Sequence, residues 1–196
     1  MRKTLLIIGL LFALSLSAQN VDSVLYAAYQ REDMRVWKEY LDTASLSPLL
    51  YEYGYCGYIV AEAKKEGKEA LLPEAKQSVQ HFKSSIINHK SQMPTGHYEM
   101  YMSAVYVYEL RLHESIHPLK AMSLAKEATR LAPADPLVLS YYGTCLFYAP
   151  KPFGNKADAL KWFTQAQAYF QGPQWKYSWV REANEMYIRQ CKEKLK

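Results

Sequence analysis

Long apolar runs are almost absent from this 196-residue chain. One uncharged run extends from Leu5 to Leu16, and its roughly twelve residues would rise only about 18 Å as a helix. The hydrocarbon core of a bilayer is about 30 Å thick, and no later stretch is apolar enough to cross it. The sequence therefore predicts no membrane span.

Cysteine is also scarce, with only Cys56, Cys145 and Cys191 in the chain. Three cysteines exclude a disulfide framework, because at most one pair can form. None of them follows the apolar run, which disfavours lipid attachment at a processed N-terminal cysteine. Cys56 and Cys145 each come two residues after a glycine, at equivalent places in two helical segments, so we expect both to pack in the core.

A large excess of charge of one sign is missing as well. The formal charge is +5, and the basic residues are interspersed with acidic ones, so the sequence gives no reason to expect a nucleic-acid partner. Arg2 and Lys3 precede the apolar run, and the small residues of 15–19 suit a signal peptidase. We therefore expect a signal peptide over 1–18 and a single exported domain over 19–196, soluble in the periplasm or outside the cell.

Strand-type alternation of apolar and polar residues is not sustained anywhere, whereas helical periodicity occupies nearly the whole chain after residue 20. The sequence thus predicts an all-α protein of about nine helices. The expected helices are 22–31, 33–44, 48–66, 73–89, 96–114, 118–131, 136–148, 156–170 and 174–194.

Three of the expected helix pairs share a pattern of small and aromatic residues. The first helix of each pair carries one small residue, and the second helix carries three small or aromatic residues at fixed offsets. The three sets are Gly54 with Ser78, Phe82 and Ser85; Ala104 with Ala121, Ala125 and Ala128; and Gly143 with Ala159, Phe163 and Ala166. On these residues the chain resembles the tetratricopeptide (TPR) superfamily, and in particular degenerate TPR-like proteins of bacterial periplasms.

The resemblance implies a right-handed array of antiparallel helix hairpins with a capping helix at the C-terminus. The hairpins would be 22–44, 48–89, 96–131 and 136–170, and the cap 174–194. Proteins of this superfamily mostly hold a peptide or a partner helix in a concave groove, and some periplasmic relatives bind small ligands. The resemblance therefore implies a protein or peptide partner, or a small hydrophobic ligand, and no cofactor.

Tyrosines mark the candidate binding surface. In the superfamily the groove is lined by side chains from the first helix of each hairpin. In this sequence the corresponding positions of the first two matched hairpins are rich in tyrosine, and helical spacing puts the tyrosines of each helix on one face. Tyrosine suits recognition because it offers a large rigid ring and a hydroxyl group. The same spacing is also typical of interior packing, and both interpretations stay open. The six tyrosines are Tyr51, Tyr55, Tyr58, Tyr98, Tyr101 and Tyr108.

A second candidate site is the literal H-E-x-x-H motif of His113, Glu114 and His117. Zinc peptidases use this spacing because two imidazoles one turn apart on a helix reach the same metal while the glutamate activates water. Pro118 follows at once and disfavours helical backbone at His117, so we expect the motif to lie in a loop. No metal site and no catalytic residue is predicted.

The function expected from the sequence is therefore binding without catalysis. Two alternatives remain: a zinc-dependent hydrolase that uses His113, Glu114 and His117, and a purely structural adaptor that uses its convex face or the tryptophans Trp175 and Trp179.

Overall fold

The protein is all-helical in its computed structural model, which describes residues 18–44, 49–114, 117–170 and 178–196. Within these ranges nine α-helices and two short 3-10 helices are present and no strand, as the sequence predicted. The α-helices are α2 (Ala18–Gln30), α3 (Arg35–Thr43), α4 (Leu49–Ala63), α5 (Leu72–Asn88), α6 (His97–Arg111), α7 (Pro118–Leu131), α8 (Pro136–Tyr148), α9 (Lys156–Phe170) and α10 (Ser178–Lys194).

The bounds of α7, α8 and α9 agree with the ranges expected from the sequence, because each start has a local cause. Asp135 precedes α8, and its Oδ1 accepts hydrogen bonds from the backbone nitrogens of Leu137 and Val138, at 2.9 and 3.1 Å. These bonds satisfy two of the amides that a helix start leaves without a partner. Pro136 occupies the first turn, where a missing N–H costs nothing.

Two helices end three residues earlier than expected, and a residue with positive φ follows within four residues of each end. α4 ends at Ala63 before Gly67, at φ 74°, and α6 ends at Arg111 before His113, at φ 61°. A left-handed residue cannot continue a right-handed helix. Of the signal peptide expected over 1–18, residues 1–17 lie outside the described residues and Ala18 begins α2. The expected start of the last helix, at 174–177, lies outside them too.

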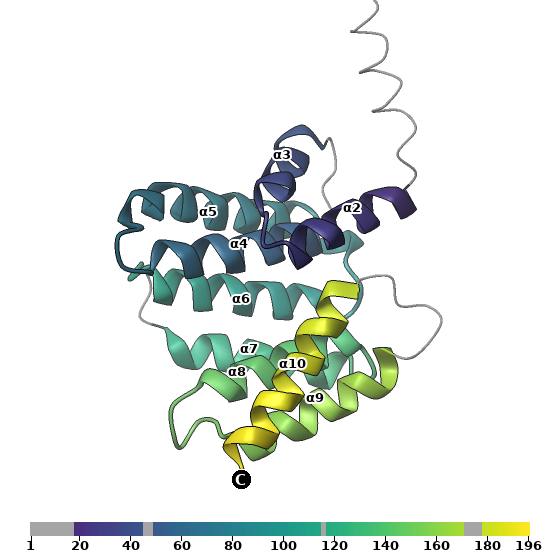
Figure 1. The fold of residues 1–196 in the computed structure, drawn as a ribbon. Coiled ribbons are helices and arrows are strands. Elements are labelled where there is room, and N and C mark those ends of the chain that lie inside the picture. The colour runs from purple at the N-terminus through teal and green to yellow at the C-terminus, as the bar shows by residue number, and fades with distance from the viewer. Residues whose placement is uncertain (1–17, 45–48, 115–116, 171–177) are drawn as a thin grey trace, which may run out of the picture.

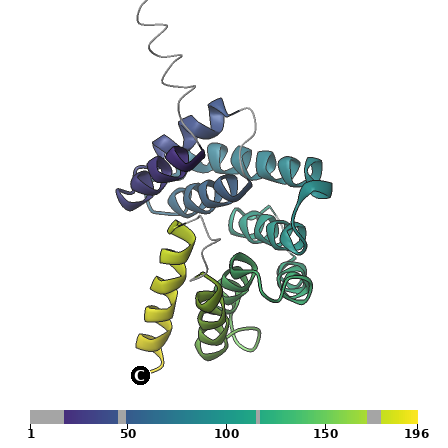
Figure 2. The same cartoon turned by 90° about the vertical axis from the view of Figure 1, so that its right-hand side faces the viewer.

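Consecutive helices pair and stack, as Figures 1 and 2 show. The pairs are α4 with α5, α6 with α7, and α8 with α9, and α5 and α7 contact the next pair. Gly143 permits the close approach within the last pair: a Cβ there would lie 2.8 Å from the Phe163 ring. This is the contact that the repeated small residues predicted.

Gly54 differs from its counterpart Gly143 in what it contacts. A Cβ on Gly54 would lie 2.6 Å from Trp37 of α3 and 3.0 Å from Trp179 of α10, instead of meeting α5. The bulky indole of Trp37 needs this space, because it is almost fully buried beside α4. The small residue is thus used for a contact with helices outside its own pair.

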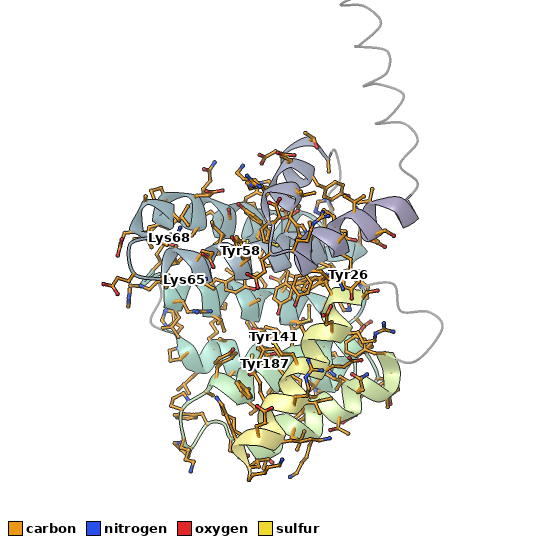
Figure 3. All side chains as sticks on the ribbon, in the orientation of Figure 1. Tyr26, Tyr58, Lys65, Lys68, Tyr141 and Tyr187 are labelled. Atoms are coloured by element: carbon orange, nitrogen blue, oxygen red, sulfur yellow. The ribbon has the colours of Figure 1, made fainter. Side chains whose placement is uncertain are left out.

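The C-terminal helix α10 brings the two ends of the array together. It packs on α9 and α8 and also contacts α2 (Figure 1). The hydroxyl of Tyr26 on α2 donates a hydrogen bond of 2.9 Å to Glu182 on α10, near the label of Tyr26 in Figure 3. The buried Asn184 amide donates to the carbonyl of Phe163, at 3.0 Å, and to Oε1 of Gln167, at 2.9 Å.

Among the described residues, no helix combines the length and the apolar character needed to cross a bilayer.

Candidate functional site

The six tyrosines of the predicted binding surface lie on α4 and α6, and most of them are inside the protein. Tyr51, Tyr55, Tyr101 and Tyr108 are buried, and Tyr58 and Tyr98 are half-buried. The two stripes therefore contribute chiefly to packing between helices. Tyr55, one of these six tyrosines, also lines a cavity.

Tyr53, which is not one of the six candidate groove tyrosines, lies at the centre of this packing. The ring of Tyr53 on α4 lies 6.0 Å from that of Tyr101 and 6.3 Å from that of Tyr108, both on α6, and 6.1 Å from that of Tyr141 on α8. The Tyr108 hydroxyl donates to the carbonyl of Tyr53, at 3.2 Å, and the Tyr141 hydroxyl is 2.9 Å from that of Ser103. Burial raises the pKa of both Tyr108 and Tyr141.

Aromatic side chains of α10 pack against two clusters of buried residues. Trp179 meets Trp37 edge to face with ring centroids 5.3 Å apart, beside the cluster that holds the tyrosines of α4 and α6. Tyr187, labelled in Figure 3, stacks on Phe163 of α9 at 5.1 Å in the second cluster, with the rings nearly parallel. The C-terminal helix therefore contributes to both parts of the core.

A cavity of about 600 Å³ lies on the other side of α4, between α3, α4 and α5. Its volume is in the range of small-molecule sites. We call it the carboxylate pocket, because three carboxyl groups line it together with one lysine. The lining residues are Lys38, Leu41, Asp42 and Ala44 from α3 and its end; Glu52, Tyr55 and Cys56 from α4; and Glu74, Gln77, Ser78, His81, Ser85 and His89 from α5 and its end.

Four of the hydrogen-bond donors that line the carboxylate pocket bond to acceptors of the protein itself, those of Lys38, Tyr55, Cys56 and His89. Nζ of Lys38 lies 2.6 Å from Asp42, and the Tyr55 hydroxyl donates to Glu74 at 2.7 Å. The Cys56 thiol donates to the carbonyl of Ser78, at 3.3 Å. Nδ1 of His89 lies 2.8 Å from the carbonyl of Ser85, so this nitrogen carries the proton.

Glu52 differs from the other carboxyl groups of the pocket. It is only 6% exposed, and its Oε2 is buried without a hydrogen-bond partner among the described residues. Burial raises the pKa of the carboxyl group, against opposing effects of a hydrogen bond from Ser85 and of the nearby His81 and His89. Buried polar atoms are nearly always paired, so an unpaired, protein-covered oxygen in a residue that also lines a cavity singles out Glu52 as a candidate ligand-binding residue.

The sequence analysis identified none of Glu52, His81 and His89 as candidate site residues. The signal was present in α4, where a glutamate stands among apolar residues one turn before Cys56. A carboxyl group on a buried helix face predicts either an ion pair or a site. Whether Glu52 forms an ion pair or a site depends on its distance to side chains of α3 and α5. Residue spacing along α4 alone does not predict that distance.

The three cysteines are free thiols in the interior or near it. Cys56 and Cys191 are buried, and burial raises their pKa values, while the pKa of the half-buried Cys145 rises to about 11. A thiol that stays protonated is a poor nucleophile. The expectation that Cys56 packs in the core is confirmed.

The H-E-x-x-H motif lies between α6 and α7, as predicted from Pro118. His113 and Glu114 follow the end of α6, and His117 immediately precedes α7. Glu114 lies 3.1 Å from Nζ of Lys76. The two histidines therefore do not share a helix face, and in the part of the chain that the structure describes no three His, Cys, Asp or Glu side chains are grouped as metal ligands.

Comparison of the chain with protein-family models, with curated proteins and with solved structures found no match.

Proposed function

We propose that the chain is an exported, non-catalytic binding module of the TPR-like class, and that it holds its ligand in the carboxylate pocket. The export part of the proposal rests on the basic residues, apolar run and small residues of 1–19. The TPR-like part rests on the repeated small and aromatic positions and on the stacked pairs α4 with α5, α6 with α7 and α8 with α9. In this arrangement α10 acts as the cap of a right-handed array.

The observation that carries the proposal is the buried Glu52 carboxyl group, which lines a cavity of about 600 Å³ and whose Oε2 has no hydrogen-bond partner among the described residues. A buried carboxyl group without a donor destabilises the folded protein, and a ligand that supplies the donor removes this cost. The tyrosines of α4 and α6 are less suited to a ligand, because their rings pack on one another and on Phe82.

The lining also favours binding over catalysis. Catalysis by acid and base groups needs a pair poised to exchange protons with a substrate. Here Asp42 is paired with Lys38, and Glu74 accepts the Tyr55 hydroxyl. These two carboxyl groups are held by groups of the protein, and Glu52 has a buried oxygen without a partner among the described residues.

The experiment is native mass spectrometry of the protein purified from its own envelope. Gln77 and Gln80 are both exposed on α5, but only Gln77 lines the pocket. We expect a non-covalent ligand on the wild type and on Gln80→Trp, and its loss from Gln77→Trp, where the indole fills the opening. A wild type without ligand, or a Gln77→Trp variant that keeps it, contradicts the proposal.

A further inference from the structure

We infer that the group held in the carboxylate pocket is a primary ammonium on an alkyl chain, with Glu52 as its buried acceptor. The inference rests on the proposed function, because it gives the chemical class of the ligand for the same pocket. Such a ligand must match the lining residues of the pocket in hydrogen bonding, in charge and in shape.

The hydrogen-bond match follows from what the lining groups lack. The donors of Lys38, Tyr55 and His89 are already bonded to acceptors of the protein. Oε2 of Glu52 is an acceptor without a donor among the described residues. A ligand that completes this set must bring donors, and a ligand made only of acceptors would face carboxylate oxygens.

The charge match follows from the balance of ionisable groups. The lining carries three carboxyl groups, Asp42, Glu52 and Glu74, against one ammonium, that of Lys38, and the imidazoles of His81 and His89. Lys38 pairs with Asp42 at 2.6 Å and also attracts Glu74, so Glu52 has no lysine of its own. A cation beside a buried carboxylate forms a charge-assisted hydrogen bond, which is stronger than a bond between neutral groups.

The shape of the site favours an ammonium over a guanidinium. A guanidinium is planar and binds best when two oxygens of one carboxylate accept it side by side. At Glu52 only Oε2 remains, since the hydrogen bond from Ser85 engages the carboxyl group. An ammonium needs one strong acceptor, and Leu41, Ala44 and the Tyr55 ring offer apolar surface for the carbons behind it.

The test is isothermal titration calorimetry of the whole mature protein with three probes that share a five-carbon chain: 1,5-diaminopentane, 1,5-pentanediol and glutarate. We expect binding of the diamine, at least tenfold weaker binding of the diol, and none of glutarate. Glu52→Gln keeps the size of the side chain and should weaken diamine binding at least tenfold. Glu127→Gln is the control, because Glu127 pairs with Arg130 on α7, far from the pocket, and its diamine affinity should equal that of the wild type.

Three results overturn the inference: no heat with any probe up to 10 mM, glutarate or the diol binding as tightly as the diamine, or an unchanged diamine affinity in Glu52→Gln. The second result leaves the proposed function standing if Gln77→Trp abolishes that binding, so the two failures are distinguishable. Circular dichroism of Glu52→Gln shows whether lost binding reflects lost fold. A further titration with the acetylated and amidated tripeptide Ala-Lys-Ala separates the two sources of the group: tighter binding than the diamine identifies a peptide lysine, and weaker binding a free amine.

Discussion

The hydroxyl of Tyr55 on α4 donates a hydrogen bond of 2.7 Å to Oε1 of Glu74 on α5. Both side chains line the carboxylate pocket, so this bond joins two of its walls. Burial raises the pKa of Tyr55, and the hydrogen bond to the Glu74 carboxylate raises it further. The protonated phenol is the donor that Glu74 requires.

Tyr55→Phe tests the contribution of this bond to stability. Loss of one hydrogen bond to a carboxylate should lower the free energy of unfolding by about 1.5–3 kcal/mol, and each kcal/mol corresponds to about 2–4 °C in Tm for a domain of this size. Thermal unfolding followed by circular dichroism measures the change. Tyr58→Phe is the matched control, since its ring lies beside that of Tyr55, at 6.4 Å, and is half-buried. Equal Tm values for the two variants would contradict the role given to the bond.

Glu52→Gln should stabilise the protein at neutral pH in buffer without amines. The raised pKa means that folded Glu52 keeps its proton at pH values where the unfolded chain has lost it. Stability is therefore lower above the raised pKa and recovers as the pH falls from there towards the ordinary carboxyl value. The other ionisable groups that line the pocket stay in place in the variant: Lys38, Asp42, Tyr55, Cys56, Glu74, His81 and His89.

The measurement is urea unfolding of the wild type and Glu52→Gln between pH 4.5 and 8. We expect the variant to be more stable at pH 8, with the difference shrinking as the pH falls. A variant less stable than the wild type across this range would mean that a partner already compensates the ionised carboxylate.

Deletion of 178–196 should expose the aromatic interior. Without α10, the stacking of Tyr187 on Phe163 and the contact of Trp179 with Trp37 are lost. Exposed aromatic surface binds 1-anilinonaphthalene-8-sulfonate, so its fluorescence should rise in the truncated protein. Tyr187→Phe, which keeps the ring, should leave the fluorescence at the wild-type level. A truncated protein that binds no dye would show that α10 is not needed to cover this face.

Replacement of His113 should leave the metal content unchanged. His113 and His117 are exposed and lie outside α6 and α7. Because His113 has φ 61°, where alanine is strained, we expect His113→Ala to alter Tm but not the zinc content. Elemental analysis after dialysis against metal-free buffer measures zinc directly. Stoichiometric zinc in the wild type that His113→Ala loses would favour the hydrolase alternative.

The helices could be predicted from the sequence because their signals are local. Asp135 and Pro136 mark the start of α8, and Pro118 marks the start of α7. The end of α6 was placed too late, because nothing in the residue type of His113 announces a positive φ.

The site could be predicted only in part, because it depends on distances between helices. Helical spacing put Tyr55 and Tyr101 on regular faces, but whether a face is open or packed depends on what covers it. Tyr101 is covered by Tyr53 and Phe82, and Tyr55 reaches a cavity. The environment of Glu52 could not be predicted from α4 alone, because α3 and α5 also form its pocket.

The proposed ligand site lies between α3, α4 and α5. Its most direct test is a crystal structure of the protein purified from its own envelope, without added ligand. We expect electron density in the carboxylate pocket within hydrogen-bonding distance of the Glu52 carboxyl group. Ligand density beside Tyr108 and Tyr141, with an empty carboxylate pocket, would contradict the proposal.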